Sequence, residues 1–184
     1  MTFADYSNWV PLLAPVTSGT TVQSFTSPDG EVWVAKNGVN NGNWYRARDV
    51  LYARVARASA LTSSTSAVLF PWANVTWDPY GIYNGTQFVA PIAGRYLLKA
   101  SIGITFTAAA QWVLLYLTCP AIGGNSAGVQ TVAGGSGTAS AVTMDSLKAS
   151  AGDAFGIFYQ TSAALAVWTN STANSATIDY LGTG

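Results

Sequence analysis

GIYNGTQFVAPIAGRYLLKASIGITF, residues 81–106, is the stretch on which the interpretation of the whole chain depends. A short aromatic-rich strand ends at Ala90, a turn follows at 91–94, and a long strand begins at Arg95. From Tyr96 to Phe106 every second residue is apolar, and the residues between them are more polar. A period of two is typical of a strand that buries one of its faces. The stretch therefore predicts two strands joined by a turn.

From residue 67 onward the whole sequence has this character. Short apolar runs alternate with Gly, Ser and Asn turns, and no helical spacing survives, which is typical of an all-β sandwich or barrel. The Ser/Thr-rich segment 61–66 predicts a boundary. We therefore expect an N-terminal arm with a small β-hairpin at 1–62 and an antiparallel β-sandwich at 67–184.

Residues 111–119, QWVLLYLTC, predict a strand that is apolar on both faces. Trp112, Leu114 and Tyr116 fall on one face, and the residues between them fall on the other. A strand of this kind must be covered on both sides. One face can pack inside the sandwich, and the other is a candidate contact with another subunit.

The arm is the part of the chain with the most unusual composition. It begins with aromatic residues, including Trp9, that are too apolar for a free tail. Basic residues then crowd one stretch, and they are Lys36, Arg46, Arg48, Arg54 and Arg57. These residues are either solvated and locally paired or a docking surface for an acidic protein partner. The segment 44–60 fits both a helix and a strand, and we favour the extended form because it leads into strands.

Composition narrows the classes of function. Hydrophobic residues make up 49% of the chain, charged residues only 9%, and the formal net charge is zero. Low charge suits a protein that lives within an assembly. The balance predicts no general attraction to nucleic acid or to a membrane surface. A single cysteine, Cys119, rules out an internal disulfide, and we expect it to be buried. We find no secretory signal and expect synthesis in a cytoplasm.

The residue types that carry catalysis are scarce. The chain contains no histidine, which removes His-dependent nucleophilic catalysis and His-based metal sites. The carboxylates from residue 67 on are Asp78, Asp145, Asp153 and Asp179, at no informative spacing. We predict no enzyme activity, no cofactor and no metal. The aromatic cluster Trp72, Trp77, Tyr80 and Tyr83 could stack on sugars if exposed, but we expect it to be buried.

Several motifs occur in the order found in one known family. Residues 85–96, GTQFVAPIAGRY, resemble the signature of the complement globular head and its tumour-necrosis-factor-like relatives, through Phe88, Pro91, Gly94 and Tyr96. Gly152 and Asp153 resemble the turn that opens a later strand, and Tyr180 lies in a segment similar to the closing strand. The resemblance implies a ten-stranded antiparallel jelly roll that forms tight trimers. The candidate trimer contacts are Trp112, Leu114, Tyr116 and Tyr180.

Two functions compete on this basis. A disulfide-free, Ser/Thr/Gly/Ala-rich chain with this fold resembles bacteriophage virion proteins. The first hypothesis is a homotrimeric decoration protein on the capsid surface, which binds the major capsid protein or another virion protein through its N-terminal arm. The second is a tail-fibre or tail-tip protein that recognises a host surface glycan, with exposed aromatic residues at its apex. An enzyme would need a carboxylate pair in a cleft.

Overall fold

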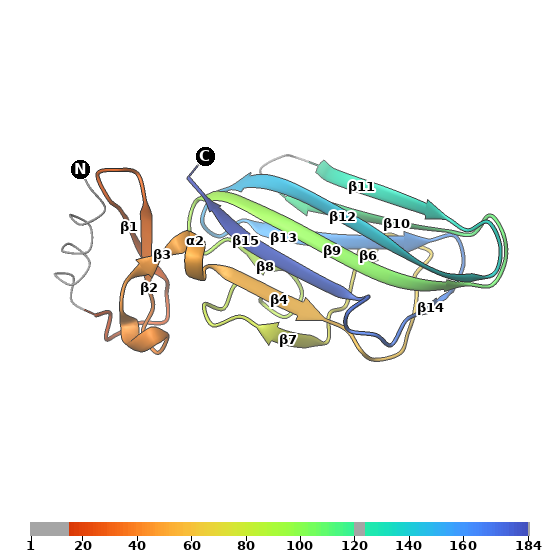
Figure 1. Cartoon of the computed structure of the whole chain (residues 1–184), viewed down its shortest axis with the longest axis horizontal. Coiled ribbons are helices and arrows are strands. Elements are labelled where there is room, and N and C mark those ends of the chain that lie inside the picture. Colours follow the sequence, from red (N-terminus) through yellow and green to blue (C-terminus); the bar gives the residue numbers. More distant parts are fainter. Residues whose placement is uncertain (1–14, 120–123, 184) are drawn as a thin grey trace.

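The computed structural model describes residues 15–119 and 124–183, and nearly all of its regular structure is β. An elongated sandwich of two sheets carries a small separate sheet at one end (Figure 1). The small sheet is antiparallel and has three strands, β1 (Gln23–Thr26), β2 (Val32–Ala35) and β3 (Tyr45–Arg46). Two short helical segments are η2 (Asn40–Gly42) and α2 (Ala47–Val50). Within the described residues, no helix has the length and apolar character that crossing a membrane requires.

The two sheets of the sandwich are antiparallel throughout. The seven-stranded sheet consists of β4 (Tyr52–Ala56), β5 (Leu61–Thr62), β7 (Asn74–Trp77), β9 (Gly94–Phe106), β12 (Gly137–Ala149), β14 (Ala166–Val167) and β15 (Ser175–Gly182). The five-stranded sheet consists of β6 (Val68–Leu69), β8 (Phe88–Val89), β10 (Trp112–Cys119), β11 (Gly124–Val132) and β13 (Ala154–Thr161). This architecture confirms the predicted all-β jelly-roll sandwich.

The core lies between the two sheets and follows the alternation read from the sequence. On β9 the inward residues Tyr96, Leu98 and Ile102 are completely buried. They face the inward side of β10, where Val113 and Leu115 are equally buried and Cys119 is nearly so. The prediction that Cys119 is a small buried residue is confirmed.

Gly94 shows why the signature needs a glycine. Its backbone lies at φ +155°, and a Cβ at this position would collide with the ring of Tyr180. Tyr180 in turn packs edge-on against Tyr96, with ring centroids 5.2 Å apart. The hydroxyl of Tyr96 donates a hydrogen bond of 2.6 Å to the carbonyl oxygen of Ile92, which fixes the turn before β9. The predicted roles of Gly94 and Tyr96 are therefore architectural.

The other parts of the predicted signature meet in space. Phe88 on β8 is buried and pairs in register with Phe155 at the start of β13. The Gly152 N–H donates to the carbonyl of Ala90 at 2.8 Å, and the Ala90 N–H donates to that of Asp153 at 2.9 Å. The segments around Ala90 and around Gly152 and Asp153, far apart in the sequence, are thus joined by backbone hydrogen bonds, and Pro91 directly follows Ala90.

The boundary between arm and sandwich lies earlier than the sequence predicted. Strand β4 pairs with β15, and β5 pairs with β14, so both belong to the seven-stranded sheet. The jelly roll therefore begins at Tyr52 and not at residue 67. The ambiguous segment 44–60 contains both forms, because one helical turn, α2, separates β3 from β4. Strand β4 lies between β15, which is remote in the sequence, and β7, which follows the Ser/Thr-rich segment, so local sequence did not reveal this boundary.

Asn174 is a buried polar residue that ties several strands together. Its side-chain oxygen accepts a hydrogen bond of 2.8 Å from the N–H of Gly103 on β9. Its amide nitrogen donates to the carbonyl of Trp168, and its backbone carbonyl accepts the N–H of Arg57 at 2.9 Å. The side chain of Trp168 covers Gly103, where a Cβ would lie only 2.6 Å from the indole ring. This contact explains why Gly103, on the outer face of β9, is buried.

Candidate interaction surfaces

The carboxylates of the jelly roll mostly support turns. Asp78 accepts hydrogen bonds of 2.7 Å from the backbone N–H groups of Ile82 and Tyr83. Asp153 accepts the N–H of Ser150 at 2.8 Å, as expected of a turn residue. In the described part of the chain, no three His, Cys, Asp or Glu side chains gather where they could hold a metal ion.

Most of the basic residues proposed for partner docking make contacts within the chain. The Nζ atom of Lys36 donates to the carbonyl of Tyr80 at 2.7 Å, which joins the small sheet to the jelly roll. Arg57 donates to the carbonyls of Pro71 at 2.6 Å and Ala60 at 3.2 Å. These two side chains hold loops in place, so the structure favours the locally paired alternative for them.

The remaining basic residues are spread over different parts of the molecule. The guanidinium of Arg46 lies 5.8 Å from the ring centroid of Trp33, a cation–π distance. Arg54 is exposed on β4. Trp9, the aromatic residue proposed to dock with them, lies outside the described residues. Docking of a partner by these basic side chains stays a prediction, and Lys36, Arg48 and Arg57 also hold contacts within the chain.

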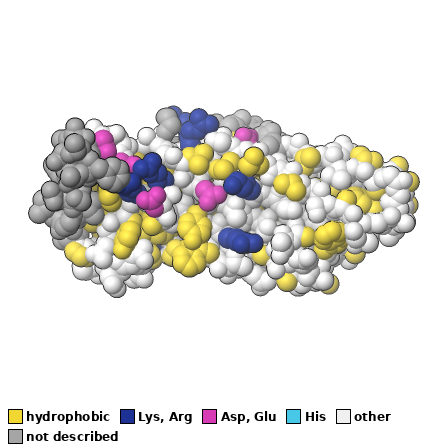
Figure 2. Space-filling model, in the orientation of Figure 1, with side chains coloured by type: hydrophobic (Ala, Val, Ile, Leu, Met, Phe, Trp, Pro, Cys, Tyr) yellow, Lys and Arg dark blue, Asp and Glu magenta, His cyan; other side chains and the backbone are white. Residues whose placement is uncertain are grey.

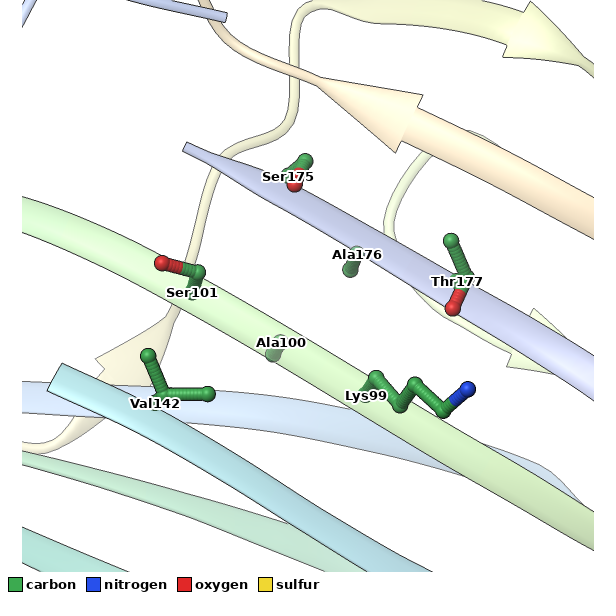
Figure 3. Close-up of a pocket in the computed structure, with 7 residues that line it drawn as sticks. All are labelled: Lys99, Ala100, Ser101, Val142, Ser175, Ala176 and Thr177. Atoms are coloured by element: carbon green, nitrogen blue, oxygen red, sulfur yellow. The ribbon is translucent and has the colours of Figure 1, made fainter. Parts of the chain in front are cut away.

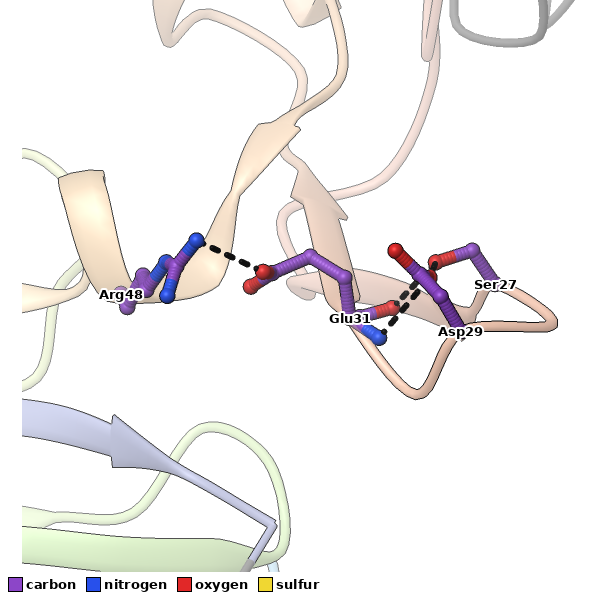
Figure 4. A network of polar contacts seen from close by, with 4 residues as sticks. All are labelled: Ser27, Asp29, Glu31 and Arg48. Carbon is purple, nitrogen blue, oxygen red and sulfur yellow. Dashed lines mark hydrogen bonds and ion pairs between the residues drawn. The ribbon is translucent and has the colours of Figure 1, made fainter. Parts of the chain in front are cut away.

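Arg48 belongs to a polar network at the joint between the small sheet and the sandwich (Figure 4). Its guanidinium forms an ion pair of 2.9 Å with Glu31 at the end of the turn after β1. Asp29, in the same turn, accepts hydrogen bonds from the Ser27 hydroxyl at 2.5 Å and from the Glu31 N–H at 3.2 Å. The bond from Ser27 lowers the pKa of Asp29 below its usual value. The network shapes the turn and connects it to α2.

The residues proposed as trimer contacts separate into two groups. Trp112, Leu114 and Tyr116 lie together on the outer face of β10 and are half-buried. Tyr180 is only 3% exposed, and burial raises the pKa of its hydroxyl. Every second residue of β15 points into the core, and Tyr180 is one of them. Tyr180 is therefore a core residue, which corrects its assignment to a subunit contact.

The outer face of the seven-stranded sheet carries several exposed apolar residues. Val142 and Met144 on β12 are each 59% exposed. Near the other edge of the sheet, the rings of Tyr52 and Trp77 stack 5.7 Å apart, and they are 39% and 49% exposed. Figure 2 shows hydrophobic side chains and charges of both signs gathered in the middle of this face.

A shallow groove of about 200 Å³ crosses the centre of the same face. Its floor is made of small residues, because Ser101 on β9 lies opposite Ser175 on β15 and Val142 on β12. Lys99 and Thr177 line the groove one step along the same strands (Figure 3). A groove with a small-residue floor beside exposed apolar side chains can receive side chains from another protein.

The predicted burial of the aromatic cluster before the signature is confirmed except at one position. Trp72 and Tyr80 are buried and Tyr83 is half-buried, whereas Trp77 is exposed. The sequence analysis missed Trp77, Val142 and Met144 as surface residues. For Val142 and Met144 the usable signal was alternation within β12, since Ala141 and Thr143 beside them are buried, whereas β7, which carries Trp77, is exposed throughout and has no such signal.

The charges are confined to part of the molecule. Residues 100–144 and 154–178 contain no Asp, Glu, Lys or Arg. These ranges include strands β10 and β13. They also include the loops between β9 and β12 that lie at the end opposite the small sheet (Figure 1). One end of the sandwich and the whole outer face around β10 are therefore neutral.

Comparison with known proteins shows a fold relationship only. No family model matches the chain, and no curated protein sequence matches it. Among solved structures, the Eiger TNF from S. frugiperda is similar, with a TM-score of 0.54 and 13% sequence identity. The similarity covers 72% of this chain and 93% of that one. The chain therefore has a TNF-like jelly-roll fold, as its signature predicted.

Proposed function

We propose that this chain is a structural virion protein, a homotrimeric decoration protein on the surface of a bacteriophage capsid. The observation that carries the proposal is the exposed apolar set on the outer face of the seven-stranded sheet, formed by Tyr52, Trp77, Val142 and Met144. A lone soluble protein gains nothing from such a face, but a protein that lives in an assembly can bury it. The disulfide-free, low-charge composition agrees with an intracellular assembly.

Self-association through this face is the first part of the proposal. Val142 and Met144 are more exposed than Trp112, Leu114 and Tyr116, which are half-buried. The groove between β12 and β15 adds a recess into which a neighbouring copy can insert a side chain. We therefore place the trimer contact on the seven-stranded sheet in preference to the outer face of β10.

The second part of the proposal is that the N-terminal part of the chain attaches to the capsid. The small sheet lies at one end of the elongated sandwich, so attachment there leaves the sandwich projecting outward (Figure 1). The ion pair of Arg48 with Glu31 and the bond from Lys36 to Tyr80 hold the small sheet against the jelly roll. The partner is the major capsid protein or another virion protein.

The competing proposal places a glycan-binding apex at the far end of a tail-fibre protein. The loops at that end are residues 107–111 and 133–136, and they consist of Thr, Ala, Gly, Ser and a single Gln. The side chain of Gln111 accepts hydrogen bonds from the N–H groups of Thr107 and Ala108 at 2.8 and 3.1 Å. Small side chains with no aromatic residue favour decoration over recognition at the apex.

Two measurements test the proposal. Analytical ultracentrifugation of the full chain is expected to give a trimer, and Met144→Asp is expected to shift it toward monomer because a charge would be buried in the contact. Removal of residues 1–43 is expected to leave a trimer that no longer sediments with capsids. A monomeric full chain, or capsid binding that survives the truncation, would contradict the corresponding part. An image of the particle would separate head from tail.

A further inference from the structure

The outer face of the five-stranded sheet contains an aromatic pair with one open side. Tyr116 on β10 lies opposite Phe158 on β13 and opposite Gly128 on β11, so the three residues form one row across the sheet. The rings of Tyr116 and Phe158 are parallel within 11°, with centroids 5.5 Å apart. On the other side of Tyr116, Gly128 has no side chain.

Among the described residues, Gly128 has room for a small side chain beside Tyr116. A Cβ built on Gly128 would meet only the Cβ of Tyr116, at 3.6 Å, an ordinary contact distance. The backbone there belongs to β11, and its φ angle is not positive, so the conformation does not require glycine. Glycine weakens a strand unless something approaches it closely. The pairing of β10 with β11 is irregular directly beside this position, between Tyr116 and Thr118, so a bulge is one reason for the glycine, and a ligand that approaches the Tyr116 side of the row is another.

Two glutamine side chains lie beside the aromatic row, two residues away along their strands. Leu114, two residues before Tyr116, lies opposite Gln130 on one side and Gln160 on the other. The Nε2 atom of Gln160 donates to the carbonyl of Thr65 at 2.8 Å, which orients this amide and keeps its carbonyl oxygen as an acceptor. Gln130 is exposed. An aromatic surface edged by amides offers both apolar contact and hydrogen bonds.

The outer face of the five-stranded sheet is uncharged. Strands β10, β11 and β13 contain no Asp, Glu, Lys or Arg. A charged ligand would gain no ion pair here, and a neutral one loses none. Trp112 lies on the same face four residues from Tyr116, about 13 Å away along an extended strand. The row of side chains is therefore longer than a single small ring.

We propose that the outer face of the five-stranded sheet binds a neutral oligosaccharide. One sugar places its C–H face over the exposed side of Tyr116, where the negative ring face attracts the weakly positive hydrogens. Its hydroxyl groups bond with the amides of Gln130 and Gln160. Exposed apolar residues lie on both sheets, since Val132 on β11 and Val142 and Met144 on β12 are each 59% exposed, so a second copy of the chain is the alternative that the test must separate. The proposal does not depend on attachment to a capsid.

The test uses the full chain and two matched glycine variants. Isothermal titration calorimetry is run with neutral hexasaccharides of glucose, mannose and N-acetylglucosamine, and with hexagalacturonate as the charged counterpart. Gly128→Val fills the space beside Tyr116 with a residue that strands favour. Gly134→Val makes the same change in the loop after β11, where a Cβ meets nothing within 4 Å.

At least one neutral hexasaccharide is expected to bind, and hexagalacturonate is not. Gly128→Val is expected to weaken binding by about tenfold or more while thermal unfolding stays unchanged, and Gly134→Val is expected to bind normally. No binding of the neutral panel up to about 10 mM would overturn the proposal, as would unchanged binding by Gly128→Val. A change in sedimentation caused by Gly128→Val would instead assign this face to a second copy.

Discussion

The small N-terminal sheet and the jelly roll are stabilised in different ways. The jelly roll surrounds a continuous core of buried rings and aliphatic side chains centred on Tyr96. The small sheet contributes Val32 and Val34 to that core, and its other contacts with the sandwich include the hydrogen bond from Lys36 and the ion pair of Arg48. Loss of contacts in the core of the jelly roll should therefore unfold the whole chain, whereas loss of contacts at the joint should affect only the small sheet.

The largest loss of stability is expected when a side chain of the signature is removed from the core. Phe88→Ala is expected to lower the free energy of unfolding by about 3–5 kcal/mol, because it removes a buried ring and leaves a cavity. Chemical denaturation followed by tryptophan fluorescence measures the effect. As a control, Val75→Ala at an exposed position of β7 should change stability little. A loss of less than about 1 kcal/mol in Phe88→Ala would show that the signature is not part of the stabilising core.

The buried hub at Asn174 provides the second test. Asn174→Ala is expected to cost about 2–3 kcal/mol, since it leaves the N–H of Gly103 and the carbonyl of Trp168 without their partner. Hydrogen exchange should show faster exchange at Gly103 and the start of β15. The exposed Asn84, which also bonds backbone groups, supplies a matched comparison, and Asn84→Ala should be milder. Equal effects of the two variants would contradict the role of burial.

Alkaline pH should destabilise the jelly roll through its buried tyrosines. Burial raises the pKa of Tyr96 above its ordinary value of 10.0, and it also raises that of Tyr180. The neutral phenol is favoured in the folded state, so its contribution is complete below pH 10 and is lost as the pH rises through the folded-state pKa. The contribution of the buried tyrosines to the free energy of unfolding should therefore stay constant up to about pH 10 and then fall. In Tyr96→Phe the fall above pH 10 should be shallower, and an unchanged slope would count against this cause.

Lys36 tests the joint directly. Lys36→Met keeps most of the side-chain length but removes the hydrogen bond to Tyr80, and we expect a cost of about 1–2 kcal/mol. The loss should be local. Hydrogen exchange in β1 and β2 should accelerate, while protection of β9 and β10 should not change. Equal loss of protection in both regions would show that the small sheet and the jelly roll unfold as one unit.

The smallest effect is expected at the ion pair of Arg48 with Glu31. Arg48 is half exposed, so solvent screening limits the coupling energy to less than about 1 kcal/mol. A double-mutant cycle with Arg48→Met and Glu31→Gln, repeated at low and high salt, measures it. A coupling well above this value would mean that the joint is held by electrostatics more than by the shared core.

The sequence predicted the parts of the fold that depend on local pattern. The alternation along β9 and the turn at Gly152 and Asp153 both lie where they were expected. Pairings between distant segments were not predictable, and β4 was assigned to the arm because the Ser/Thr-rich segment 61–66 predicted the boundary, although β4 pairs with both β15 and β7. The surfaces were harder still. Whether a basic residue such as Lys36 faces solvent or a carbonyl of Tyr80 depends on tertiary packing that no local pattern encodes.

The uneven distribution of charge gives the molecule two ends that respond differently to ionic strength. Residues 100–144 contribute no Asp, Glu, Lys or Arg of their own, whereas the joint and the seven-stranded face carry both signs. Added salt screens exposed charges beyond about 8–10 Å at physiological concentrations, and it leaves neutral contacts almost untouched. Binding measured across a salt series should therefore reveal which end of the sandwich a partner holds. A salt-independent partner belongs to the neutral end.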